Sequence, residues 1–179
     1  MASAYAFIDP GAGFPGISNT GTFNTSSGPS APLMFGLIAG AKDPTFGYAE
    51  FMFVSGATVS APTAGDACLL QGGGAQQLVS GNTASQGPVG IAATAISNTN
   101  VYGWVQVYGV CDYANFGTQG TAAVGLPVVI GTTAGRLQST AGATGYIING
   151  LKVSQYSTTA NSNSAILNMY YPVYDGRNQ

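Results

Sequence analysis

Glycine interrupts this chain so often that no window of eleven or more residues keeps a helical apolar repeat free of it. A glycine inside a helix costs about 1 kcal/mol relative to alanine, so long helices are not expected. From about Leu33 onward, short runs rich in β-branched and aromatic residues alternate with clusters of Gly, Asn, Ser and Thr. This pattern predicts an all-β domain, a small barrel or sandwich with frequent turns.

The β-rich runs and the turn residues between them give the boundaries of the expected strands. These are 47–55, 67–71, 76–80, 89–96, 101–110, 126–130, 136–138, 145–153 and 165–174. Gly150 predicts a bulge inside its strand. Pro172 has no N–H, so the last strand should end there or lie at a sheet edge. Alternation places four apolar residues of that strand on one face: Leu167, Met169, Tyr171 and Val173.

Two of the expected strands are especially rich in aromatic residues. In 47–55, alternation places Phe51 and Phe53 on one face. In 101–110, the valines lie on one face, which we interpret as core. The other face carries larger polar and aromatic groups, which we interpret as a contact surface: Tyr102, Trp104, Gln106 and Tyr108. Trp104, Tyr108 and Tyr102 are therefore the candidate oligomer contacts.

Residues 1–32 read as an extended N-terminal arm, and residues 33–179 as the β-rich domain. The arm is broken by Asp-Pro-Gly, Phe-Pro-Gly and Ser-Gly-Pro sequences, yet it carries large apolar side chains that a solvated linker does not need. We interpret these as anchors that lie in grooves of a neighbouring subunit. The candidate anchors are Tyr5, Phe7, Ile8, Phe14 and Phe23. The alternative is a terminus that is ordered only locally.

Composition argues against several function classes. Charged residues make up 6% of the chain, with four basic residues and a net charge of −2, so no positive stripe for nucleic acid is expected. The chain has no histidine, which removes the commonest general base and metal ligand. The six acids are scattered. We therefore expect no catalytic residues, no cofactor, no metal site and no enzymatic activity.

The two cysteines, Cys68 and Cys111, are too few for a disulfide scaffold. Two small buried thiols are the favoured interpretation, and one bridge remains open. The start of the chain lacks a basic, apolar leader, and the longest apolar run, 31–41, is broken by glycines. A product made in the cytoplasm, without membrane association, is expected. So few charges also predict that copies of the chain or a partner cover much of its surface.

Several turn-and-strand motifs follow one another in the middle of the chain. A D-P-T-F-G turn at 43–47 leads into A-E-F-M-F at 49–53 and then Gly56. Farther on, G-P-V-G-I-A occupies 87–92 and Y-G-W-V-Q-V-Y-G occupies 102–109. Over roughly residues 37–138, the order and spacing of these motifs resemble a family of small structural proteins of tailed phages.

The resemblance implies a capsid decoration, or cement, protein with a β-tulip or β-barrel fold and an N-terminal arm. Such proteins bind the exterior of an icosahedral head built from an HK97-like major capsid protein, commonly as homotrimers at local three-fold axes. The expected location is thus the virion exterior, with residues 1–32 clamping capsid subunits. A tail or baseplate component and a carbohydrate-binding adhesin are the alternatives.

Overall fold

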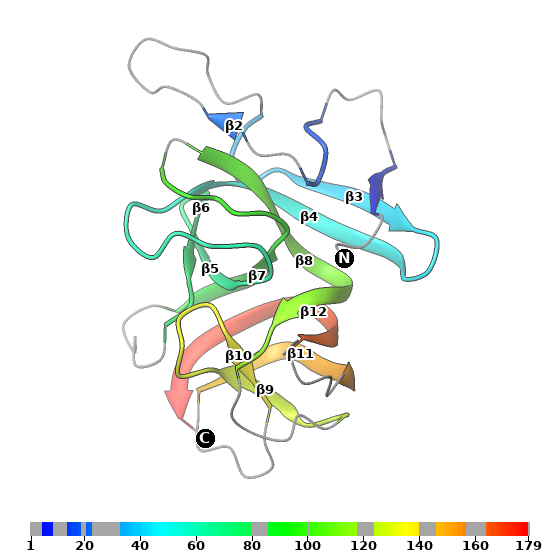
Figure 1. The fold of residues 1–179 in the computed structure, drawn as a ribbon, viewed down its shortest axis with the longest axis vertical. Coiled ribbons are helices and arrows are strands. Elements are labelled where there is room, and N and C mark those ends of the chain that lie inside the picture. The colour runs from blue at the N-terminus through cyan, green and yellow to red at the C-terminus, as the bar shows by residue number, and fades with distance from the viewer. Residues whose placement is uncertain are drawn as a thin grey trace.

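The computed structural model of the protein (Figure 1) describes residues 5–8, 14–18, 21–22, 33–79, 86–99, 101–117, 124–139, 146–156 and 164–178. Every regular element in these ranges is a β-strand. The strands are β1 (Ala6–Phe7), β2 (Gly21–Thr22), β3 (Ile38–Asp43), β4 (Gly47–Gly56), β5 (Ala67–Gln71), β6 (Gly74–Gln77), β7 (Gly87–Ala92), β8 (Val101–Asn115), β9 (Pro127–Ile130), β10 (Leu137–Gln138), β11 (Tyr146–Tyr156) and β12 (Ser164–Asn178). The all-β, barrel-like prediction is confirmed.

Five strands close into a small ring. The order β4-β6-β5-β7-β8 returns to its start because β4 also pairs with β8. The β4–β6 pairing is parallel, and the other pairings of the ring are antiparallel. Small and β-branched side chains fill the ring, among them Val54, Ala75, Ile96 and Val105. Closing the sheet leaves these strands without a free edge, which limits pairing with other chains.

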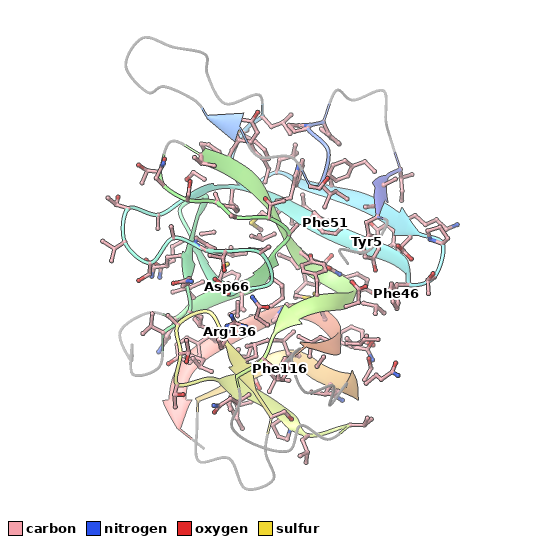
Figure 2. All side chains as sticks on the ribbon, in the orientation of Figure 1. Tyr5, Phe46, Phe51, Asp66, Phe116 and Arg136 are labelled. Carbon is pink, nitrogen blue, oxygen red and sulfur yellow. The ribbon has the colours of Figure 1, made fainter. Side chains whose placement is uncertain are left out.

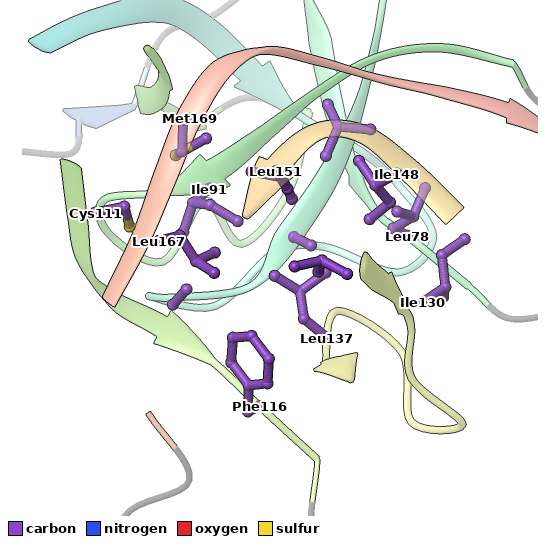
Figure 3. Packing of buried hydrophobic residues seen from close by; sticks show 14 of the residues in the cluster. Leu78, Ile91, Cys111, Phe116, Ile130, Leu137, Ile148, Leu151, Leu167 and Met169 are labelled. Carbon is purple, nitrogen blue, oxygen red and sulfur yellow. The ribbon is translucent and has the colours of Figure 1, made fainter. Parts of the chain in front are cut away.

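A second curved layer continues from the ring through β8-β12-β11-β9-β10. It lies in the lower half of Figure 1. An isolated bridge between Phe116 and Leu137 brings the end of β8 back to β10. The largest apolar cluster packs between this layer and strands β5 and β7 of the ring (Figure 3), with Ile91 and Leu167 both fully buried.

The third cluster lies outside the ring, on the face of β3, β4 and β8 that the N-terminal segment covers. Phe51, Phe53 and Trp104 are fully buried there. Tyr5 and Phe51 lie close together in Figure 2, with ring centroids 5.5 Å apart. The N-terminal segment is held by main-chain pairing of β1 with β3 and of β2 with β8. The described parts of the N-terminal segment thus pack on the chain's own β-domain.

Strand positions agree well with the sequence predictions in several places. The strand at 67–71 is found as expected, and β9 and β10 form the expected hairpin. Gly150 lies at a register irregularity of β11, as the predicted bulge requires. The strand β3 was not anticipated, and β8 runs five residues beyond its expected end.

The prediction that the last strand ends at Pro172 or lies at an edge is wrong. Strand β12 continues to Asn178 between β8 and β11, and it also pairs with β7. Pro172 lies in a stretch of β12 that is out of regular register with β11, where the missing N–H removes no regular ladder bond. The same irregularity reverses the alternation, so Met169 and Tyr174 are buried while Tyr171 and Val173 are exposed.

The buried carboxylate of Asp66 joins four parts of the chain. Its Oδ2 accepts hydrogen bonds from the N–H and hydroxyl of Thr63 and from Nε2 of Gln77, at 2.6–2.8 Å. Its Oδ1 accepts one from Nδ2 of Asn115 at 3.1 Å. Gly135 packs so closely against this carboxylate that a Cβ there would lie 2.6 Å from it. This acid therefore has a structural role.

Candidate functional site

The candidate anchor residues of the arm do not project from the described structure as a group. Tyr5 is buried and donates a hydrogen bond to the carbonyl of Val110 at 2.7 Å. The rings of Phe7 and Phe14 lie 4.7 and 6.0 Å from that of Trp104. Ile8 is exposed. The remaining candidate, Phe23, lies outside the described residues.

The expectation that Trp104 is a surface contact is wrong. Its side chain is fully buried, and its Nε1–H donates to the carbonyl of Pro15 at 3.0 Å. Gln106 of the same face is also buried. Alternation correctly places these residues opposite the valines, but a segment about ninety residues earlier in the chain covers Trp104. Strand β8 is consequently buried on both faces over much of its length.

The other two candidates on β8 have different surroundings. Tyr102 is partly buried beside Phe53, with ring centroids 5.2 Å apart, and β2 pairs with the strand at this position. Tyr108 lies farther along the strand, opposite Glu50, and is partly exposed. It belongs to a surface cluster that the sequence analysis did not identify.

This cluster, which we call the tyrosine patch, consists of Tyr48, Glu50, Tyr108, Tyr170 and Tyr171. It extends over β4, β8 and β12, which are neighbours in the sheet. Glu50 is the register partner of Tyr108, and Tyr108 is that of Tyr170, so the three form one row across the strands. Directly opposed residues lie close enough for their side chains to interact. Tyr48, Tyr170 and Tyr171 are each about half exposed (46%, 55% and 52%).

Glu50 is held by two phenols. Tyr48 donates a hydrogen bond to its Oε1 at 2.9 Å, and Tyr171 donates one to its Oε2. Ionising either phenol would break its bond and place a second negative charge beside the carboxylate. The hydrogen bond to Glu50 therefore raises the pKa of Tyr171 to about 12 and raises the pKa of Tyr48 as well. Both phenols stay protonated donors at neutral pH.

Two backbone features place the rings on this surface. Gly40 on β3 lies beneath Tyr48, where a Cβ would come within 2.9–3.0 Å of the phenol. Tyr171 has a φ of +47°, in the left-handed region that side chains rarely adopt. It follows Tyr170 in the irregular part of β12, so two consecutive tyrosines are exposed together. The sequence contained a signal for this in the Tyr-Tyr-Pro at 170–172, because proline in a strand favours bulges.

A shallow depression of about 190 Å³ lies within the patch. It is lined by Tyr48, Tyr108, Gly109, Val110, Asn168, Met169 and Tyr170. The rings of Tyr108 and Tyr170 stand nearly perpendicular, at 83°, with centroids 6.0 Å apart. A larger depression of about 380 Å³ lies near Val59 and Gln71, and no charged side chain lines it.

The thiols offer no reactive group. Cys68 and Cys111 are both free and buried, which agrees with the favoured interpretation. Burial raises the pKa of Cys111 to about 12 and the pKa of Cys68 well above its usual range. Both therefore remain neutral thiols, the unreactive form. Among the residues that the structure describes, no three His, Cys, Asp or Glu side chains are grouped to hold a metal ion.

Comparisons with models of protein families, with curated proteins and with solved structures find no match for this chain. Within the described ranges, no helix is long and apolar enough to cross a membrane. Function is therefore inferred from the residues themselves, and the tyrosine patch is the surface whose chemistry is best suited to binding.

Proposed function

We propose that this chain is a structural protein of a phage particle that binds the outer surface of an icosahedral head and stabilises the shell by bridging capsid subunits. The observation that most supports this proposal is the tyrosine patch. It exposes several hydroxylated aromatic rings together on a sheet, in a chain with very few charges. Tyrosine is enriched in protein interfaces, and charged residues are depleted from their cores. The partner is a major capsid protein of the HK97-like class, and the binding form is a homotrimer.

The motifs that resemble the decoration family also form one structural unit, which supports the proposal. In the turn at 43–47, Oδ1 of Asp43 accepts hydrogen bonds from the N–H groups of Thr45 and Phe46 at 2.6 and 2.9 Å. The turn joins β3 to β4, and β4 pairs directly with the 102–109 segment of β8. Two residues of these motifs, Glu50 and Tyr108, are themselves members of the patch.

The shell role has a mechanical basis. A protein that contacts several capsid subunits at once gains from multivalency, because each further contact is made within an existing complex. Individual contacts of modest affinity then give tight attachment to an assembled shell and weak attachment to a lone subunit. A trimer with three tyrosine patches meets this requirement.

The first test is the copy number of the protein in purified particles, measured against the major capsid protein by quantitative mass spectrometry. A ratio near one to one supports decoration of the whole head, because only the shell offers so many equivalent sites. A handful of copies per particle indicates the alternative, a tail or baseplate component. Absence from particles overturns the virion role and favours the adhesin alternative.

A second test is the rebinding of purified protein to undecorated shells. Deleting residues 1–32 is a poor variant for this purpose, because Tyr5, Phe7 and Phe14 also cover the cluster around Trp104. Tyr108→Ala combined with Tyr171→Ala leaves that cluster intact, and we expect it to reduce shell loading by at least about tenfold. Val59→Ala, on an exposed side chain outside the patch, is the matched control. Full loading by the double variant would exclude the patch as the contact surface.

A further inference from the structure

The tyrosine patch carries a partly buried carboxylate that has no counter-charge. Within the described structure, Glu50 is bonded to two neutral phenols and to no Lys or Arg side chain. Two lysines lie on the same face, Lys42 as the register partner of Tyr48 and Lys152 as the register partner of Asn168. Both are exposed, and neither forms an ion pair with Glu50. The carboxylate is partly exposed, so its charge can be reached by a cation from outside the chain.

The hydrogen bonds fix what the patch presents to a ligand. The hydroxyl hydrogens of Tyr48 and Tyr171 point to Glu50, so the lone pairs of the phenol oxygens and of the carboxylate remain as acceptors. The faces of the tyrosine rings carry the negative end of the ring quadrupole. Acceptors, ring faces and the carboxylate therefore all favour a ligand that is positively charged and rich in N–H donors.

The shape of the site favours a flat cation. Tyr48, Tyr108 and Tyr170 line the depression, and the rings of Tyr108 and Tyr170 stand nearly perpendicular to each other. Guanidinium is planar, stacks on aromatic faces and bonds carboxylates through two parallel N–H groups. Ammonium is a compact, strongly hydrated point charge that does neither as well.

The backbone supplies an independent indication that this is a binding site. Tyr171 adopts a left-handed conformation that is strained for a non-glycine residue, and it is half exposed. Its ring makes no contribution to a buried core that would offset this cost. Strain of this kind tends to persist at ligand sites, where the strained residue is held in position for binding.

We propose that the tyrosine patch is an arginine-binding site: it takes an arginine side chain of a protein partner, stacked on the tyrosine rings with its N–H groups bonded to Glu50. The identity of the partner rests on the proposed function, in which the arginine belongs to the outer surface of a capsid subunit. Glu50 is the residue that sets specificity for a cation, and the four tyrosines supply the contact area.

The test uses the intact protein and two small probes of the same shape. N-acetyl-arginine methylamide carries the guanidinium, and N-acetyl-citrulline methylamide replaces it with a neutral urea. Binding is followed by NMR of the tyrosine ring resonances, each assigned from its Tyr→Phe variant. We expect saturable shifts at the patch tyrosines with the arginine probe and at least about tenfold weaker binding of the citrulline probe.

Glu50→Gln keeps the shape of the patch and removes its charge. It should therefore lower the affinity for the arginine probe by at least about fivefold and leave the affinity for the citrulline probe unchanged. Lys42→Gln is the matched control on the same face, and it should bind the arginine probe as well as the wild type or better. Thermal unfolding verifies that both variants are folded. Equal affinity for the two probes, absence of saturable shifts, or saturation by methyl glucoside in place of the arginine probe would each overturn the inference.

Shell binding separates this inference from the proposed function. If the Glu50→Gln variant neither binds the arginine probe nor loads onto shells, both proposals are supported. If the wild type loads shells but does not bind the arginine probe, the arginine site is wrong while the decoration role stands. If it binds the probe but never loads shells, the site stands and its partner is a different protein.

Discussion

The sheet formed by β3, β4 and β8 carries aromatic side chains on both faces, but those of one face are buried and those of the other are partly exposed. One face packs Phe51, Phe53 and Trp104 beneath the N-terminal segment and is fully buried. The other face lines the ring where Val54 and Val105 are buried, and only its remaining part carries the tyrosine patch, which is open to solvent. The covered face mixes phenylalanine and tryptophan with Tyr5 and Tyr102, whereas the aromatic residues of the patch are all tyrosines. A phenol hydroxyl tolerates water while its ring remains available for contact, so the open face is suited to a partner that binds later.

The largest difference between the two faces should be in stability. Trp104→Ala removes a fully buried ring and the donor to Pro15, so we expect a loss of about 3–5 kcal/mol in the free energy of unfolding. Tyr170→Ala removes a ring that is half exposed, so we expect a loss below about 1 kcal/mol. Urea unfolding followed by circular dichroism measures both. Equal losses would mean that the patch belongs to the core after all.

The backbone of the open face can be tested at Tyr171. Because Tyr171 adopts a left-handed conformation, Tyr171→Gly relieves strain that Tyr171→Ala retains. We expect the glycine variant to be more stable than the alanine variant by about 1–2 kcal/mol, although glycine normally weakens a strand. Both variants lose the same ring and the same bond to Glu50, so their difference isolates the backbone. An alanine variant as stable as the glycine variant would contradict the left-handed conformation.

Tyrosine hydroxyl groups on the two faces should also differ in how much they contribute to the free energy of unfolding. Tyr5→Phe keeps a buried ring but loses the hydrogen bond to the carbonyl of Val110, and we expect a loss of about 1 kcal/mol. Gln106 also donates to that carbonyl, at 2.9 Å, which keeps the loss from being larger. Tyr48→Phe, on the open face, should change stability by less than about 0.5 kcal/mol. Urea unfolding of the pair tests whether the bond to Glu50 contributes to folding or is available for binding.

The covered face and the open face were not equally predictable from the sequence. Alternation along 47–55 correctly placed Phe51 and Phe53 together, because a strand period of two is a local property. The same rule placed Trp104 on the opposite face from the valines, and that is also correct. What it could not indicate was the cover, because the segment that contributes the acceptor at Pro15 lies 89 residues away in sequence. Exposure depends on such long-range packing, and alternation does not report it.

The tyrosine patch was missed for two further physical reasons. Its members come from three strands, and only the register of β4 with β8 and of β8 with β12 brings Glu50, Tyr108 and Tyr170 into one row. Register across a closed sheet is a property of the whole fold. The irregular stretch at 170–172 then reverses the side-chain alternation of β12, so a strict period of two assigns Tyr171 to the same face as the buried Met169.

The smallest predicted effect is the most direct probe of the open face: the ionisation of its phenols. The pKa of Tyr171 is about 12 and that of Tyr48 is raised, in both cases chiefly by the hydrogen bond to Glu50. Because the folded pKa lies above the ordinary value of 10, the stabilisation from this bond is fully present below about pH 10 and is lost as the pH rises through about 12. Ultraviolet absorbance of phenolate after a rapid pH jump reports the folded protein before it unfolds.

Glu50→Gln should lower both pKa values toward 10, whereas Lys42→Gln, which removes a charge from the same face without touching the hydrogen bonds, should not lower them. Identical titration curves for the wild type and Glu50→Gln would show that the phenols do not hold the carboxylate, and the open face would then lack the fixed acceptors on which its proposed preference for arginine depends.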